Sequence, residues 1–449
     1  MANRIDSNPS YPDISMSDKL YKEALGLIPS VTQTLAKGPG QYIKGIAPKY
    51  LKKGKGAHVW DVDGNEYIDF NMGIGPLSLG YAYPEVDNAI IEQLKDGITF
   101  SLMHPLEVEV AQMLHRIIPN AESIRYSKSG ADVTSAAIRV ARAFTGRNKV
   151  LCCGYHGWHD WYIATTDRSR GIPQEVKDLT YTFNYNDIQS VIDSMDDDVA
   201  CVILEPVVFE APRDNFLQKL YDICRANGSL LIFDEMWTGF RLALGGAQEY
   251  FKIRADLACY SKAVANGMPI SILTGRKDIM SLFEKDVFFY TTFGGEALSL
   301  AAVKATVKVL EEKNVPAYLD RQGGRIKAGY NSIAEEFGMK YTKCMGYNCR
   351  TILTFDASAG NPLEMKSLVQ QELIKRGILW GGFHNISFSH TDEDVEYTLK
   401  AYREVLQILQ RAAEENNIKG YLKGEAVEPV FRKTGNFNTK PKHSTFTIR

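Results

Sequence analysis

Short apolar runs and amphipathic segments alternate through the middle of the chain. Apolar runs of roughly four to eight residues are typical of strands that are covered on both faces. Such runs occupy residues 124–127, 149–153, 199–206, 230–233 and 257–260, and helical apolar spacing occupies residues 107–118, 133–144, 216–227 and 296–312. Strands that alternate with helices in this way predict an α/β fold built on a mainly parallel sheet.

The two ends of the chain follow a different pattern. Residues 57–70 form two alternating runs on either side of Asp63-Gly64, which predicts a β-hairpin. After about residue 320 we expect helices at 321–337, 361–376 and 392–415, with short strands at 350–355 and 378–380. The predicted divisions are an N-terminal arm and joining segment at 1–75, a large domain at 76–319, a small domain at 320–419 and a polar tail at 420–449. Within the first division, residues 1–20 are expected to be a mobile arm, followed by a first helix at 20–28.

Polar residues follow two of the predicted strands at the point where each strand ends. Asp234 and Glu235 come directly after residues 230–233, and Ser261 and Lys262 come directly after residues 257–260. The carboxyl ends of parallel strands are where open α/β sheets place their chemistry. An acid and an amine that face each other there suggest pyridoxal phosphate (PLP), with the lysine bonded to the cofactor aldehyde and the acid on the ring nitrogen. A plain Asp234–Lys262 salt bridge is the alternative.

The motif around these residues resembles the signature of class III aminotransferases. It reads Asp234-Glu235-x-x-Thr238-Gly239-Phe240-Arg241, followed by Ser261-Lys262-x-x-x-x-Gly267-x-Pro269. Within that class, residues 230–233 and 245–248 are most similar to the glutamate-1-semialdehyde 2,1-aminomutase branch, and the similarity covers roughly residues 27–402. The resemblance implies an aspartate aminotransferase-like PLP-dependent transferase type I fold, with a mainly parallel seven-stranded sheet in a large domain and a smaller α+β domain. It also implies Lys262 as the Schiff-base lysine and Asp234 as the partner of the ring nitrogen.

A second stretch has the form of an anion site. A strand at 124–127, a small polar turn and a helix from Val133 place free backbone N–H groups at a helix N-terminus. We assign the PLP phosphate to Ser129, Gly130 and Ala131, and an ordinary helix cap by Ser129 is the alternative. The family often has a hydroxyl residue where this chain has Ala131.

Four further residues are assigned to the cofactor from the resemblance. Tyr155 and His156 match an aromatic-His-Gly turn whose ring stacks on the cofactor, and a core aromatic is the alternative. Glu205 lies near the cofactor in relatives, although it could equally cap the next helix. Thr292 matches a threonine that reaches the phosphate of the neighbouring subunit, which predicts a homodimer, whereas a local turn is the alternative. Arg241 is a secondary candidate for the wall of the site, or else a surface arginine.

The reaction is expected to be amino transfer from an amino acid, with L-glutamate as donor, to an aldehyde or ketone acceptor, either a sugar-like intermediate or another carbonyl compound. The aminomutase is the second candidate, but it places an arginine after its Leu-Ile-Pro segment, where this chain offers only Lys37. Residues 71–76 also lack the aminomutase aromatic, and the extra aromatics Trp158, Trp161 and Tyr162 favour a larger acceptor. A non-catalytic binding protein with the same fold is a remote third possibility.

Composition and charge narrow the remaining choices. A hydrophobic content of 45%, a charged content of 24% and a net charge of −2 give no electrostatic case for a nucleic acid or membrane partner. No apolar run approaches the roughly 20 residues of a membrane span, and the polar N-terminus predicts a cytoplasmic protein. The seven cysteines show neither zinc spacing nor a disulfide framework, so no metal is expected.

Overall fold

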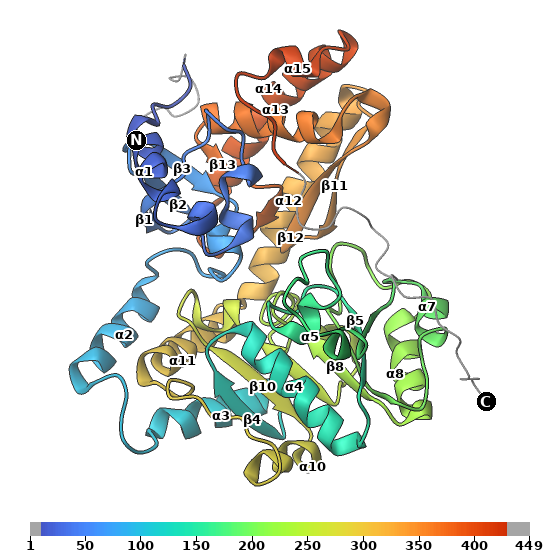
Figure 1. Ribbon diagram of the computed structural model, residues 1–449. Coiled ribbons are helices and arrows are strands. Elements are labelled where there is room, and N and C mark those ends of the chain that lie inside the picture. The colour runs from blue at the N-terminus through green and yellow to red at the C-terminus, as the bar shows by residue number, and fades with distance from the viewer. Residues whose placement is uncertain (1–9, 429–449) are drawn as a thin grey trace. The chain divides into compact units, whose positions relative to one another are not determined.

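The computed structural model describes residues 10–428, which separate into two compact units (Figure 1). The terminal unit comprises residues 10–83 and 317–428 and therefore joins both ends of the described chain. The central unit comprises residues 84–316 and is continuous in sequence.

A seven-stranded sheet forms the middle of the central unit, in the order β4-β10-β9-β8-β7-β5-β6. Only β10 runs antiparallel to its neighbours, so the predicted mainly parallel seven-stranded sheet is confirmed. The strands are β4 (Ser123–Ser127), β5 (Lys149–Cys153), β6 (Thr180–Thr182), β7 (Val199–Leu204), β8 (Leu230–Asp234), β9 (Leu257–Tyr260) and β10 (Ser271–Gly275).

Helices cover this sheet, and α4 crosses one of its faces (Figure 1). The inner side of α4 is apolar because Val133, Ala137 and Val140 recur at helical spacing and are fully buried. The longer helices of the unit are α2 (Pro84–Asp96), α3 (Pro105–Ile117), α4 (Gly130–Thr145), α8 (Phe216–Asn227) and α11 (Ala297–Glu312). The short ones are α5 (Asp160–Ile163), α6 (Gln174–Lys177), α7 (Ile188–Ile192), α9 (Ala247–Phe251), α10 (Lys277–Met280), η5 (Lys262–Ala265) and η6 (Ser281–Glu284).

The terminal unit contains two small sheets and long helices. One sheet has the order β1-β2-β3-β13 and includes the predicted hairpin, and the other has the order β11-β12-β14. The strands are β1 (Leu51–Lys55), β2 (His58–Asp61), β3 (Glu66–Asp69), β11 (Thr342–Tyr347), β12 (Arg350–Phe355), β13 (Ile378–Leu379) and β14 (Phe383–Asn385). The helices are α1 (Ser15–Leu25), α12 (Val315–Glu336, which starts in the last residues of the central unit), α13 (Pro362–Lys375), α14 (Asp392–Glu414), α15 (Ile418–Tyr421), η1 (Pro29–Val31), η2 (Leu35–Lys37), η3 (Pro39–Gln41), η4 (Met72–Ile74) and η7 (Ala357–Ala359).

Both ends of the chain are more ordered than the sequence pattern indicates. The first helix begins at Ser15 because the carboxylate of Asp63 accepts hydrogen bonds from the backbone N–H groups of Met16 and Ser17, at 2.6 and 3.0 Å. At the other end Val427 is buried in the terminal unit, so the predicted tail begins as packed chain. The remainder of the predicted arm, residues 1–9, and of the tail, residues 429–449, lies outside the described residues.

The described residues contain neither a membrane-spanning helix nor a cluster of metal-binding side chains. No helix within residues 10–428 is long and apolar enough to cross a membrane. In the same range no group of three or more His, Cys, Asp or Glu side chains is arranged to hold a metal ion.

Two buried histidines tie the stability of the terminal unit to pH. His384 lies between the Thr351 and Tyr402 hydroxyls, at 2.8 and 2.6 Å, and His390 stacks on Phe70 with a centroid distance of 4.7 Å. Burial lowers the pKa of His384 to about 3 and that of His390 to about 4. Both rings are therefore neutral in the folded state, whereas the unfolded chain takes up protons below about pH 6.5. The folded state accordingly loses stability as the pH falls from about 6.5 toward the folded pKa values.

We expect His384→Gln to reveal this effect. At pH 7 the variant should be less stable than the wild type, because the two hydroxyl contacts are lost. Between pH 7 and pH 5 the difference should shrink by roughly 2 kcal/mol, since only the wild type carries the protonation penalty at this position. Urea unfolding at both pH values measures the difference. His104→Gln, which changes a half-exposed histidine, is the control, and a pH-independent difference for His384→Gln would contradict the expectation.

Candidate active site

Strand pairing brings the predicted acid and amine to one edge of the central sheet. Strands β8 and β9 are parallel neighbours, with Asp234 opposite Cys259. Lys262 begins η5, two residues beyond the end of β9. The two side chains therefore come from adjacent strand ends, as the sequence predicts.

The backbone at Lys262 is in an unusual conformation. Its φ of +48° lies in the left-handed region, which residues with a side chain rarely adopt. The loop is held there because the Ser261 hydroxyl donates to the carbonyl of Ile270 at 2.6 Å. Strained backbone of this kind concentrates at functional sites, where it fixes the direction of a reactive side chain.

An aromatic wall next to Lys262 was not found from the sequence. The Lys262 Nζ lies 4.4 Å from the ring centroid of Trp237. The guanidinium of Arg241 lies 4.9 Å from the same centroid, and its Nη1 donates to the Trp237 carbonyl at 3.0 Å. Arg241 is only 3% exposed, so the surface-arginine alternative is wrong. In the sequence, the only indication that Trp237 belongs to the site is its position three residues after Asp234.

Asp234 is 1% exposed and is paired with His156. Its Oδ2 lies 2.8 Å from the Nδ1 of His156, and the Nε2 of His156 lies 3.1 Å from the carbonyl oxygen of Cys153. Both ring nitrogens of His156 thus face oxygen atoms that can accept hydrogen bonds. The Oδ1 of Asp234 accepts from the backbone N–H of Met236 at 3.1 Å. These partners offset the cost of burying a carboxylate and fix its orientation.

The first turn of α4 is compatible with both roles predicted for Ser129 and its neighbours, a helix cap and a phosphate site. Its hydroxyl accepts from the Asp132 N–H at 3.3 Å, and the Asp132 carboxylate accepts from the Ser129 N–H at 2.8 Å, so Ser129 caps the helix. The N–H groups of a first turn have no partner within their own helix. Gly130 and Ala131 can therefore donate to an anion while Ser129 acts as the cap.

Close packing joins this turn to the other motifs. A Cβ added at Gly130 would lie 3.0 Å from the sulfur of Met236, and one added at Gly157 would lie 2.7 Å from the Cβ of Ala131. The helix N-terminus, the aromatic-His-Gly turn and the segment after Asp234 are thus in contact. Glycine is required at position 157, where φ is +105° and an added side chain would meet Ala131, whereas a side chain at position 130 would have to displace the end of Met236.

Glu205 acts on Tyr155 through the backbone. Glu205 is buried, and its Oε1 accepts from the N–H of Tyr155 at 2.7 Å. The Tyr155 side chain is 52% exposed and contacts Tyr162 edge to face, with a centroid distance of 5.5 Å. Tyr155 is therefore not a core aromatic, and its ring remains accessible for stacking.

Thr292 differs from the other predicted residues because it is exposed. Among the described residues its side chain makes no hydrogen bond within the chain. Its loop lies close to the end of β4, since a Cβ at Gly294 would lie 2.8 Å from the carbonyl oxygen of Tyr126. Lys128 fixes the following turn by an ion pair with Glu296 at 2.7 Å.

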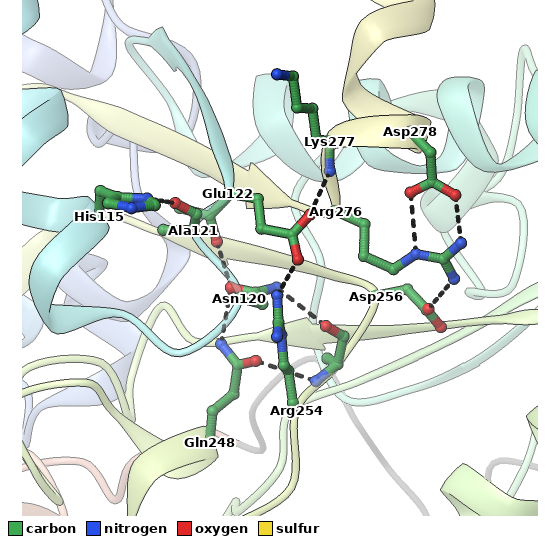
Figure 2. A network of polar contacts seen from close by, with 12 residues as sticks. His115, Asn120, Ala121, Glu122, Gln248, Arg254, Asp256, Arg276, Lys277 and Asp278 are labelled. Carbon is green, nitrogen blue, oxygen red and sulfur yellow. Dashed lines mark hydrogen bonds and ion pairs between the residues drawn. The ribbon is translucent and has the colours of Figure 1, made fainter.

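A buried polar network holds the strands that carry Asp234 and Lys262. Glu235 accepts from the backbone N–H groups of Ala247 and Gln248 at 2.9 and 3.0 Å, and burial raises the pKa of Glu235 to about 7. The Gln248 amide donates to Asn120 at 3.1 Å (Figure 2). It also donates to the Tyr260 hydroxyl at 2.8 Å. Because Tyr260 is the last residue of β9, this network anchors the strand that leads into Lys262.

The set of groups in this cluster fits pyridoxal phosphate. Lys262 supplies an amine for an aldehyde, and Asp234 supplies a buried carboxylate for a ring nitrogen. The α4 N-terminus offers N–H groups for a phosphate, and Tyr155 offers an accessible aromatic ring for stacking.

Comparisons with known proteins identify the family of the chain. The family model of aminotransferase class III matches residues 44–391. A 3-aminobutyryl-CoA aminotransferase from Cloacimonas acidaminovorans is 34% identical over 406 residues, covering 88% of this chain and 97% of the relative. A glutamate-1-semialdehyde 2,1-aminomutase from Archaeoglobus fulgidus is also 34% identical, over 428 residues, covering 88% of this chain and all of the relative.

Solved structures of PLP-dependent proteins have the same fold as this chain. The PLP internal aldimine form of the FumI protein from Sphingopyxis sp. MTA144 matches with a TM-score of 0.82 and 27% identity, covering 88% of this chain and 97% of that one. A transaminase with PLP bound matches with a TM-score of 0.81 and 25% identity, covering 90% of this chain and all of that one. The chain therefore belongs to the class-III aminotransferases and is a PLP-dependent enzyme.

Proposed function

We propose that this enzyme transfers an amino group from an amino-acid donor, L-glutamate, to an aldehyde or ketone acceptor of sugar-like character. The observation that carries the proposal is the placement of Lys262 beside Trp237 and one strand away from buried Asp234. An amine in that position can attach a cofactor and afterwards act as a base.

Each residue has a distinct role in this proposal. The bound cofactor supplies an electron-withdrawing ring that makes deprotonation of the adjacent carbon feasible. Asp234, oriented by His156, would hold the protonated ring nitrogen. Lys262 would supply the amine that attaches the group and would afterwards act as a base at the substrate carbon. The N–H groups of Gly130 and Ala131 would bind the phosphate, and Tyr155 would stack on the ring.

The residues assigned to the cofactor do not distinguish amino transfer from the internal amino shift. That choice depends on the residues that contact the substrate. The two relatives are equally similar, and their names refer to a CoA-linked substrate in one case and to glutamate 1-semialdehyde in the other. The absence of an arginine after residues 27–29 supports amino transfer, because Lys37 lacks the bidentate fork that grips a carboxylate.

The extra aromatic residues support the sugar-like acceptor less than the sequence indicates. Trp158 is 70% exposed and is available to an acceptor. Trp161 and Tyr162 are buried, and their polar atoms bind Ser135 at 3.0 Å and the carbonyl of Gly154 at 2.8 Å. Of these three aromatic residues, only Trp158 therefore remains a candidate for contacting a polyhydroxylated substrate.

Mixing the purified enzyme with L-glutamate should change its cofactor absorbance, and a suitable carbonyl acceptor should restore the original spectrum. Lys262→Ala should lower turnover by roughly 10²–10⁴-fold or more, because both the attachment and the proton transfer are lost. Borohydride reduction followed by mass spectrometry should find the cofactor mass on wild-type protein and not on the variant.

Lys277→Ala, which changes an exposed lysine at the start of α10, is the control and should behave as wild type. Turnover of glutamate 1-semialdehyde without an external donor would establish the aminomutase instead. A purified wild type that takes up no cofactor would favour the non-catalytic alternative.

We also propose a homodimer in which Thr292 reaches the phosphate of the partner's cofactor. Exposed apolar side chains gather next to its loop, including Leu102 at 80% and Met103 at 82% exposure. Ile98 and Phe293 line the same surface hollow, so the segment at 98–103 adjoins the loop of Thr292. Apolar patches of this kind mark protein–protein interfaces.

The cytoplasmic location stays a prediction from the sequence.

Replacing Leu102 and Met103 by aspartate should convert the dimer into a monomer, because two charges would be buried at the interface. Sedimentation should give about twice 50.3 kDa for the wild type and about 50.3 kDa for the double variant. Leu25→Asp with Leu27→Asp, which changes two exposed leucines of the terminal unit, is the matched control. A wild type that sediments as a monomer would refute the shared site.

Trp237 should report directly on cofactor loading. Because its indole lies within 4.4 Å of the Lys262 amine, a cofactor bound there should quench Trp237 emission more than that of any distant tryptophan. Adding PLP to cofactor-free protein should therefore reduce emission much less in Trp237→Phe than in the wild type. Trp60→Phe, in the terminal unit, is the control. Equal quenching in the wild type and in Trp237→Phe would show that Trp237 does not line the cofactor site.

A further inference from the structure

One lysine of the terminal unit is half-buried without a partner for its charge. Lys366 lies in the second turn of α13 (Figure 1) and is only partly accessible to solvent. Within residues 10–428 its amine makes no hydrogen bond and no ion pair. Polar groups that leave the solvent are normally satisfied by a partner in the protein, and exceptions are often reactive groups. The surroundings of Lys366 therefore bear on its chemistry.

Other half-buried lysines of the chain have the partner that Lys366 lacks. Lys128 and Lys149 form ion pairs with Glu296 and Asp196, at 2.7 and 2.6 Å. Taking an ammonium group out of water is unfavourable unless an opposite charge or hydrogen-bond acceptors replace the lost hydration. Lys366 has neither, so burial penalises its protonated form.

The amine of Lys366 lies against the turn between β13 and β14. A Cβ added at Gly382, in this turn, would come within 3.2 Å of the Lys366 Nζ and 3.3 Å of its Cε. Gly382 has a φ of +124°, so the turn itself favours glycine at this position. The end of the lysine side chain therefore packs on the turn instead of extending into solvent.

The elements around α13 supply no carboxylate for this amine. Strands β12 and β13 and helices α14 and α15 pack on α13. Glu372 of α13 and Glu404 of α14 are both bound to Arg376, at 2.9 and 2.8 Å. The positions three and four residues from Lys366 on its own helix hold no charged residue. Among residues 10–428 no acid therefore lies within ion-pair distance of Lys366.

Burial without a counter-charge makes this amine a nucleophile near neutral pH. It lowers the pKa of Lys366 to about 8. At pH 7.5 roughly a quarter of the Lys366 side chains are then neutral, compared with about 0.1% for a lysine with an ordinary pKa. Only the neutral amine has a free electron pair that can attack an electrophilic carbon. The amino-transfer reaction proposed above gives this nucleophile no role.

We propose that Lys366 is a site of acylation by activated acyl donors, either thioesters or acyl phosphates. The neutral amine attacks the carbonyl carbon of the donor, and an amide C–N bond forms. The bond from that carbon to sulfur or oxygen breaks, the thiolate or phosphate leaves with its electron pair, and the amine proton passes to solvent. The amide is neutral, so acylation removes the charge that is unfavourable at this position. Methylation would retain that charge.

Site-resolved labelling of the PLP-loaded enzyme tests the proposal, with acetyl-CoA and acetyl phosphate as probes in separate reactions. Peptide mass spectrometry follows the acetylation of Lys366 and of two exposed lysines in the same unit, Lys340 and Lys343. At pH 7.5 Lys366 should react at least about fivefold faster than either reference, because far more of it is neutral. Above about pH 8 its rate should level off while the reference rates continue to rise. The probe with the larger preference for Lys366 identifies the donor class.

Two variants test the unpaired charge itself. Lys366→Gln removes the charge, whereas Lys366→Arg retains it. At pH 7 Lys366→Gln should unfold at a higher urea concentration than Lys366→Arg, because only the first lacks a half-buried charge. Lys340→Gln, at an exposed lysine, is the matched control and should leave the unfolding midpoint unchanged. The proposal is overturned if Lys366 reacts no faster than Lys340 and Lys343 with either probe, if its rate rises with pH as theirs do, or if Lys366→Gln is no more stable than Lys366→Arg.

Discussion

The parallel pairing of β8 with β9 is the constraint on which the active site depends. It sets Asp234 opposite Cys259, so that the buried carboxylate and the lysine three residues beyond Cys259 emerge at neighbouring strand ends. Each of the two groups needs further contacts to hold it in this position. The carboxylate requires His156 and the Met236 N–H as partners, and the lysine requires a loop held in a left-handed conformation.

The supporting interactions lie largely out of reach of the substrate. Glu235 and Gln248 connect the segment after β8 to Tyr260 at the end of β9, and Glu205 holds the turn that presents Tyr155. Because the contacts of Gln248 with Glu235 and Tyr260 are buried, the loss of one partner would leave another unsatisfied at a cost of about 1–3 kcal/mol. Such contacts preserve the geometry of the site without touching the reacting atoms.

Much of this arrangement could be predicted from the sequence, for identifiable reasons. Buried strands have strong local signals, so β5 and β9 were predicted with the bounds that the structure gives them. Residues whose role depends on distant partners were harder to predict. Trp237 meets Lys262 only once β8 and β9 are paired, and the helix at Ser15 starts where it does because Asp63 lies in a distant turn. Trp161 and Tyr162 were expected near a substrate, yet they are buried because Ser135 and Gly154 satisfy their polar atoms.

The discontinuity of the terminal unit bears on the order in which the chain can fold during synthesis. Strand β3 lacks its parallel partner β13 until residues near 379 have emerged from the ribosome, and Lys44 meets Glu425 only after residue 425 has emerged. Among residues 10–428 the central unit is contiguous and lacks this dependence. Domains generally fold as units while the chain grows. The N-terminal strands must therefore wait, with their apolar faces uncovered, while the sheet that carries Asp234 and Lys262 assembles first.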